Sequence, residues 1–174
     1  MRKLILVSLT LLLLCGAAVD HGFAQAKTLK FPKDDPQFTI TFANDWKAEI
    51  TDAGIISAQP KGAGYAISIF PVAARNPSGA IEETETEVNK RFQNVKPSEP
   101  VEFKTANNIK YLERHYTATD KGSDRILAIV AFSPDGENYY ALFQASTPEA
   151  DKQYTQDVVA IVKSIKSLKA SDDE

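Results

Sequence analysis

The sequence predicts an α+β fold in which a central antiparallel sheet has helices packed on its two faces, an α/β/α sandwich. Short runs of alternating apolar and polar residues, separated by turns rich in Gly, Asn and Asp, indicate the strands of a meander. Two runs, 65–72 and 125–133, are largely apolar in both alternating sets, so both faces of the sheet must be covered. Two segments with helical spacing, 79–92 and 147–167, supply that cover.

Residues 1–26 are predicted to be a signal peptide. Arg2 and Lys3 precede an apolar run at 4–14, and Ala24-Gln25-Ala26 matches an A-x-A cleavage pattern, so we expect cleavage after Ala26. The remaining chain shows no internal repeat or interdomain linker and is long enough for one core. We therefore expect a single domain at 27–170, followed by an acidic tail at 171–174.

Two alternatives to cleavage stay open. The apolar run ends at residue 19, short of the about 20 residues that a spanning helix needs, so a retained anchor would be short. Lipid modification of Cys15 is the other alternative, and the large Leu14 argues against it because bacterial lipoproteins carry a small residue before the cysteine. We expect a periplasmic or secreted protein with no membrane span after cleavage.

Charge and cysteine content exclude several classes of protein. Removal of residues 1–26 takes away two basic residues and one acidic residue, which leaves a net charge of about −4. This charge gives no electrostatic attraction to nucleic acid or to anionic lipid. Cys15 is the only cysteine, so the mature domain has no disulfide and no cysteine nucleophile.

The strand pattern is clearest at the start of the domain. Phe38, Ile40 and Phe42 occupy one face of a strand, and Trp46 follows after a turn, where we expect it to close one end of the core beneath a helix. The expected strands are 28–31, 38–42, 47–51, 55–59, 65–72, 101–105, 109–119, 125–133 and 138–146.

The two expected helices differ in how much apolar surface they offer. The first begins with Ser78 as the N-cap. Its apolar stripe is thin and shares a face with Glu85, so this helix should lie on the surface with one narrow buried edge. The second begins with Thr147 as the N-cap and Pro148 as the first helical residue. Its continuous stripe consists of Tyr154, Val158, Ile161, Val162 and Ile165.

Four features of the sequence occur together: Phe38-x-Ile40-x-Phe42 with Trp46, a mid-chain helix before a four-strand meander, the pair Tyr139-Tyr140, and a terminal helix with its Ile161-to-Lys166 end. In these features the chain resembles the PsbP-like superfamily, which includes PsbP and the DcrB-type envelope proteins. Ala43 departs from the proline that members usually carry after the second aromatic. The resemblance implies the fold and a protein-binding role, and it supplies no shared catalytic residues.

The parts of an enzyme are missing from the mature chain. A hydrolase needs a nucleophile, a base and an orienting acid, yet the chain has no G-x-S-x-G motif and a single histidine, His115. Glu113 shares a strand face with His115, but a metal would still lack a third ligand. The acids at 82, 83, 85 and 87 are interpreted as a solvated helix face, and the glycines at 61–64 as turn residues. We expect no enzyme activity, no cofactor and no metal.

Aromatic residues and one histidine give the candidate binding surface: Tyr111, His115, Tyr139 and Tyr140. Adjacent Tyr139 and Tyr140 must face opposite sides of their strand, so they belong to one patch only if a bulge intervenes. We expect an exported, non-enzymatic domain that binds a protein of the bacterial envelope or helps to assemble a complex. The alternative is a carrier of a small ligand or lipid, with an apolar pocket between the sheet and a helix.

Overall fold

The structure, a computed structural model, describes residues 26–104 and 107–169. The predicted signal peptide, Cys15 and the acidic tail at 171–174 lie outside these residues, apart from Ala26. The helices are α1 (Pro77–Arg91) and α2 (Pro148–Lys163). The strands are β1 (Lys27–Phe31), β2 (Phe38–Phe42), β3 (Trp46–Ile50), β4 (Ile56–Pro60), β5 (Tyr65–Val72), β6 (Gln93–Pro97), β7 (Val101–Lys104), β8 (Lys110–Asp120), β9 (Ser123–Phe132), β10 (Tyr139–Ser146) and β11 (Lys166–Ser167).

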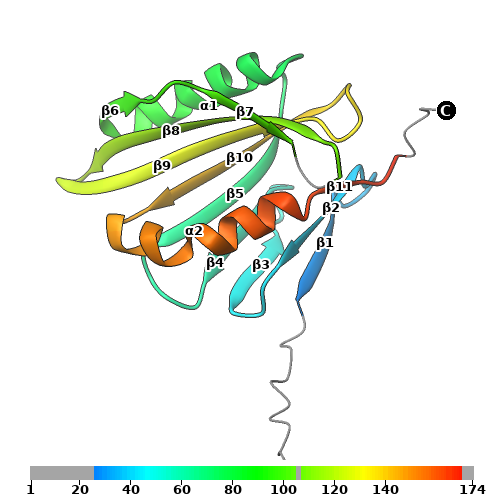
Figure 1. Cartoon of the computed structure of the whole chain (residues 1–174), viewed down its shortest axis with the longest axis horizontal. Coiled ribbons are helices and arrows are strands. Elements are labelled where there is room, and N and C mark those ends of the chain that lie inside the picture. The colour runs from blue at the N-terminus through cyan, green and yellow to red at the C-terminus, as the bar shows by residue number, and fades with distance from the viewer. Residues whose placement is uncertain (1–25, 105–106, 170–174) are drawn as a thin grey trace, which may run out of the picture.

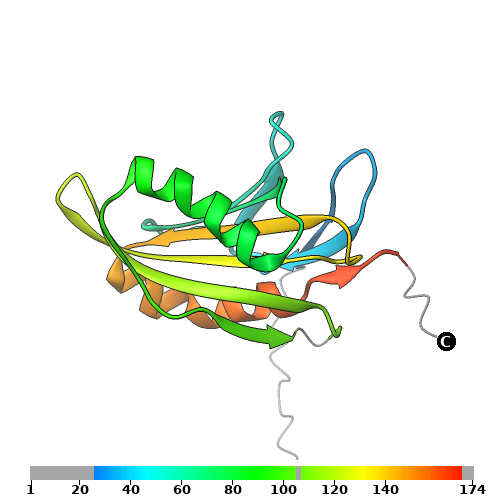
Figure 2. The ribbon, with the colours of Figure 1, turned by 90° about the horizontal axis from the view of Figure 1, so that it is seen from above.

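A large antiparallel sheet forms the centre of the molecule, and the two helices lie on its opposite faces (Figures 1 and 2). The strand order is β3-β4-β5-β10-β9-β8-β6, with β7 beside β8 on the same edge as β6. The α+β prediction is therefore confirmed. In the described part of the chain, no helix is both long and apolar enough to cross a membrane.

A second, three-stranded sheet with the order β1-β2-β11 shares the α2 face of the large sheet. Its inward residues are those of the predicted alternating strand, and Phe38, Ile40 and Phe42 are all fully buried. The ring of Phe38 packs edge-on against Phe132 of β9 and Tyr140 of β10, at 5.2 and 5.0 Å between ring centroids. The α2 face is thus covered by a helix and a small sheet together.

The predicted extension of the second helix to residue 167 is wrong. The helix ends at Lys163, because Ser164 caps it, and the next residue, Ile165, is buried in the core. The chain then pairs with the free edge of β2, where the Leu168 amide donates to the Gln37 carbonyl at 2.8 Å. The carbonyl groups at the end of α2 accept from the residues that follow the helix: the Ser164 amide bonds to Ala160 and Ile161, and the Ile165 amide bonds to Val162.

Two details of the α1 region also differ from the prediction. The N-cap is Asn76, whose Oδ1 accepts from the Gly79 amide at 2.8 Å, rather than Ser78. After the helix, β6 forms a strand that the sequence analysis missed, since its residues are mostly exposed and show no alternating apolar pattern. Its register against β8 shifts between Gln93 and Lys96.

Glu85 is not part of a solvated helix face. Its Oε1 accepts from Arg114 Nη1 at 3.0 Å and from the Tyr116 hydroxyl at 2.8 Å, both on β8. Glu83 also has partners, because its carboxylate accepts from the backbone amides of Ala73 and Ala74 before α1. These contacts attach the polar side of α1 to the sheet, which compensates for its thin apolar stripe.

Trp46 lies beneath α2, as the sequence analysis expected. The side chain is 3% exposed, and its ring packs edge-on against Tyr65 of β5 and Tyr154 of α2, with centroids 5.8 and 6.0 Å apart. The indole Nε1 donates to Asp157 Oδ2 at 3.4 Å. The three aromatic rings close one end of the core.

We expect Trp46→Ala to lower the free energy of unfolding by about 3 to 5 kcal/mol, because it removes a buried aromatic ring from a packed cluster. Urea denaturation followed by circular dichroism measures this change. The control is Val159→Ala on the exposed side of α2, which should change stability by less than about 0.5 kcal/mol. Equal stability of the two variants would contradict the core role of Trp46.

Candidate functional site

Tyr111 and His115, two of the four predicted site residues, lie on the α2 face of β8 at the edge of the large sheet. Side chains alternate along a strand, so Glu113 shares this face with them. The adjacent edge strand β7 places Phe103 opposite Tyr111 and Val101 opposite Glu113. We call these five residues the edge patch.

The edge patch exposes apolar surface. Val101 is 48% exposed and Phe103 is 45% exposed, although both are large hydrophobic residues. The Phe103 and Tyr111 rings stack at 5.5 Å between centroids with an interplanar angle of 23°. Such stacking orients both rings at little entropic cost, which suits an aromatic surface for recognition of another molecule.

His115 and Glu113 form an ion pair within the edge patch, with 2.9 Å between His115 Nε2 and Glu113 Oε1. The hydrogen bond to this carboxylate raises the pKa of His115, while partial burial of the ring acts in the opposite direction. The described residues contain no group of three His, Cys, Asp or Glu side chains placed to hold a metal ion. The ion pair therefore places a charged imidazole and a carboxylate at the edge of the sheet. Among the described residues it has no third His, Cys, Asp or Glu side chain beside it that could complete a metal site.

Tyr139 and Tyr140 lie elsewhere and on opposite faces of β10, as strand alternation requires. Tyr140 is 3% exposed and packs in the core against Phe38 and Phe132, where burial raises its pKa to about 12. Tyr140 therefore offers no binding surface. Tyr139, which is half-buried, lines a cleft at the end of the sheet.

This cleft has a volume of about 1220 Å³ and is bounded by the start of β8, the β9–β10 turn and β11. Asp135 occupies the turn, and its side chain is only 3% exposed. Burial alone would raise the pKa of this carboxyl group, but the donors around it hold the pKa well below its usual range. The donors are the Glu137 amide at 3.0 Å, the Asn138 amide at 2.8 Å, Asn138 Nδ2 at 2.7 Å, Ser133 Oγ at 3.2 Å and Lys169 Nζ at 3.0 Å.

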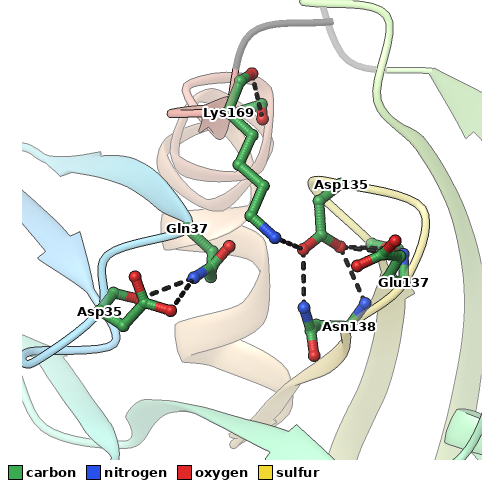
Figure 3. Close-up of polar contacts among 8 residues, drawn as sticks. Asp35, Gln37, Asp135, Glu137, Asn138 and Lys169 are labelled. Carbon is green, nitrogen blue, oxygen red and sulfur yellow. Dashed lines mark hydrogen bonds and ion pairs between the residues drawn. The ribbon is translucent and has the colours of Figure 1, made fainter. Parts of the chain in front are cut away.

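Figure 3 shows how residues from distant parts of the chain meet at this carboxylate. Lys169 follows β11 and reaches Asp135 across the end of the sheet. Gln37 precedes β2, and its Nε2 donates to the backbone oxygen and the Oδ2 of Asp35 at 3.0 and 2.7 Å. We call Asp35, Gln37, Asp135 and Lys169 the turn cluster.

The sequence analysis missed the turn cluster. Residues 134–137 lie between the expected strands 125–133 and 138–146, and an aspartate in such a turn commonly bonds only to its own backbone. The separation of 34 residues between Asp135 and Lys169 carries no periodic signal. Only the pairing of β11 with β2, which follows from the whole fold, brings the lysine to the turn.

Comparison with known proteins defines the class of fold. No protein-family model matches the sequence, and no curated protein matches it. The structure is similar to cyanobacterial PsbP (CyanoP) from Synechocystis sp. PCC 6803, with a TM-score of 0.59, 10% identity, and coverage of 88% of this chain and 98% of that one. The fold is therefore PsbP-like, as the resemblance implied.

Two further solved structures have similar folds. LpqN of Mycobacterium tuberculosis, which is described as involved in cell envelope biogenesis, gives a TM-score of 0.54 at 12% identity, with coverage of 82% of this chain and 91% of that one. A Pseudomonas aeruginosa protein of unknown function gives 0.50 at 10% identity, with coverage of 86% and 99%. At these identities the similarity establishes the fold alone.

The ion pair in the edge patch has a pH signature. We expect the pKa of His115 to lie above its ordinary value of 6.5 and to fall in Glu113→Gln, because the variant removes the partner charge. The stabilisation is present below pH 6.5 and is lost as the pH rises through the raised pKa, since it depends on protonated imidazole. NMR titration of the His115 ring protons measures both values. A pKa of 6.5 or less in the unsubstituted protein would refute the ion pair.

Proposed function

We propose that this chain is an exported, non-enzymatic domain that binds another protein of the bacterial envelope and helps to assemble a complex. The predicted signal peptide and the PsbP-like fold support export to the envelope. The similarity in fold to LpqN, a protein described as involved in cell envelope biogenesis, supports a role in the envelope. Protein binding is supported separately, by the surface of the edge patch.

The observation that carries this proposal is the combination of an open strand edge with exposed aromatic and aliphatic side chains. Strand β7 is four residues long, all four are exposed, and within the described residues it pairs only with β8. Unpaired backbone groups on an edge strand can add a strand from a partner, and side chains on alternate positions then give specificity. Phe103 and Val101 occupy those alternate positions on the α2 face.

A non-enzymatic role is consistent with the chemistry of the described residues. Their one histidine, His115, is bonded to Glu113, and the buried Asp135 is bonded to five donors. A general base must reach the proton it abstracts, and both groups are already engaged by neighbours. No observation favours the alternative of a carrier for an apolar ligand. The cleft beside Asp135 is open and lined by lysines and acids, and a smaller open cleft beside Tyr65 is lined by Arg91, Asp120 and Arg125.

Site-specific photocrosslinking in the native host tests the proposal. A photoreactive residue at Val101 should give a discrete adduct with one envelope protein, because Val101 lies on the exposed edge. Adding Phe103→Asp should reduce the adduct by about tenfold, since aromatic anchors contribute most of the binding energy in such interfaces. The melting temperature should fall only slightly, because Phe103 is 45% exposed and loses mainly its stacking contact with Tyr111.

The matched control is a photoreactive residue at Gln59, an exposed position on β4 toward the opposite edge of the same sheet. It should give no discrete adduct. Identical adducts at Val101 and Gln59, or none at Val101, would contradict binding through the edge patch.

A further inference from the structure

The turn cluster gathers acceptors around one ammonium group. Gln37 Nε2 makes both of its hydrogen bonds to Asp35, so the amide is oriented with its oxygen on the other side. Figure 3 shows this oxygen pointing toward the Lys169 ammonium, which donates to Asp135 Oδ2 at 3.0 Å. The backbone bond from Leu168 to Gln37 places these residues side by side.

The site has more acceptor capacity than Lys169 uses. Gln37 is 5% exposed, and its Oε1 is buried with no hydrogen-bond partner among the described residues. A buried acceptor without a partner costs free energy, whereas an ammonium group carries three donors. The Lys169 ammonium faces both the Asp135 carboxylate, to which it bonds, and the Gln37 oxygen, to which it does not (Figure 3).

Lys169 is held weakly in this position. Its side chain is 48% exposed, and it follows a strand of only two residues. Ion pairs at such exposure contribute little to stability, so the lysine can leave. The Asp135 side chain, by contrast, is only 3% exposed, and its carboxylate attracts a cation to the site.

The surroundings of the site also favour a second cation. The carboxylates of Asp35 and Glu137 add negative potential at the Lys169 ammonium. Lys110 and Lys166 line the same cleft, but Lys169 is the one lysine that bonds to Asp135 in the described part of the chain. Asp135 and Lys169 both line the open cleft of about 1220 Å³, so a partner can approach the carboxylate from this side.

We propose that the turn cluster is a receptor for the primary ammonium group of a lysine side chain on a protein partner, and that Lys169 occupies this receptor when the partner is absent. The inference rests on the proposed function, because it specifies one chemical group of the partner. Binding exchanges one lysine for another at Asp135 and adds the bond to Gln37 that Lys169 does not make.

The test uses the full chain with Lys169→Ala and n-butylammonium chloride as the probe, followed by amide NMR at Glu137 and Asn138. We expect saturable shifts in Lys169→Ala, and binding about threefold weaker in the unsubstituted protein, where Lys169 competes for the same carboxylate through an exposed ion pair. Lys169→Met, which keeps the apolar stem, should behave like Lys169→Ala and replaces it if the alanine variant does not fold. Asp135→Asn and Gln37→Met, each combined with Lys169→Ala, should weaken binding.

Two matched probes separate the contributions. Tetramethylammonium carries the charge without N–H donors and should give no saturable shifts, while N-acetyl-lysine methylamide should bind like n-butylammonium. The inference is overturned if tetramethylammonium binds equally well, if neither Lys169 variant binds n-butylammonium, or if the lysine amide fails to bind while the free amine does. A discrete adduct at Val101 with no ammonium binding would overturn this inference and leave the proposed function in place.

Discussion

The burial of both faces of β9 and β10 is the constraint on which the rest of the structure depends. On the α1 face, Leu127, Ile129 and Ala131 of β9 are fully buried, and on the other face Val130 and Phe132 are buried as well. A strand of this kind cannot sit at an edge or beneath a single layer, because half of its apolar surface would meet water. The sheet therefore needs cover on both sides, and the two helices follow from that need.

The two faces of the large sheet are covered unequally, and this inequality decides where the turn cluster lies. Helix α1 covers its face with few apolar residues, supported by the bonds from Arg114 and Tyr116 to Glu85. The other face is wider than α2 alone, and β1, β2 and β11 fill the remaining area. Because β11 must follow α2 to complete this small sheet, it carries Lys169 past the β9–β10 turn. The turn cluster therefore forms as a consequence of the pairing of β11 with β2, which completes the cover of the core on the α2 face.

Sequence patterns predicted the helices and strands that bury one or both of their faces. They did not predict the strands that form only because a neighbouring strand offers a free edge. Burial of one face produces the alternation of Phe38, Ile40 and Phe42 and the apolar stripe of α2. Both elements were therefore predicted. Strands β6 and β11 bury little and exist because β8 and β2 offer them free edges, which is information held elsewhere in the chain. The candidate site divides in the same way. Tyr111 and His115 share an exposed edge, whereas Tyr140 points into the core, and periodicity does not tell which face of a strand is covered more deeply.

The alternation of side chains along β8 constrains how the length of this strand can change. One set, with Tyr111 and His115, forms the edge patch, and the other set, with Arg114 and Tyr116, holds α1. Deletion of one residue within β8 would move the residues that follow it to the opposite face, so the edge patch and the contacts to α1 would be disrupted together. The two-residue turn at Lys121 and Gly122, where both φ angles are positive, lies beyond this strand and can change without that penalty. Insertions and deletions should therefore be tolerated in this turn and not within β8.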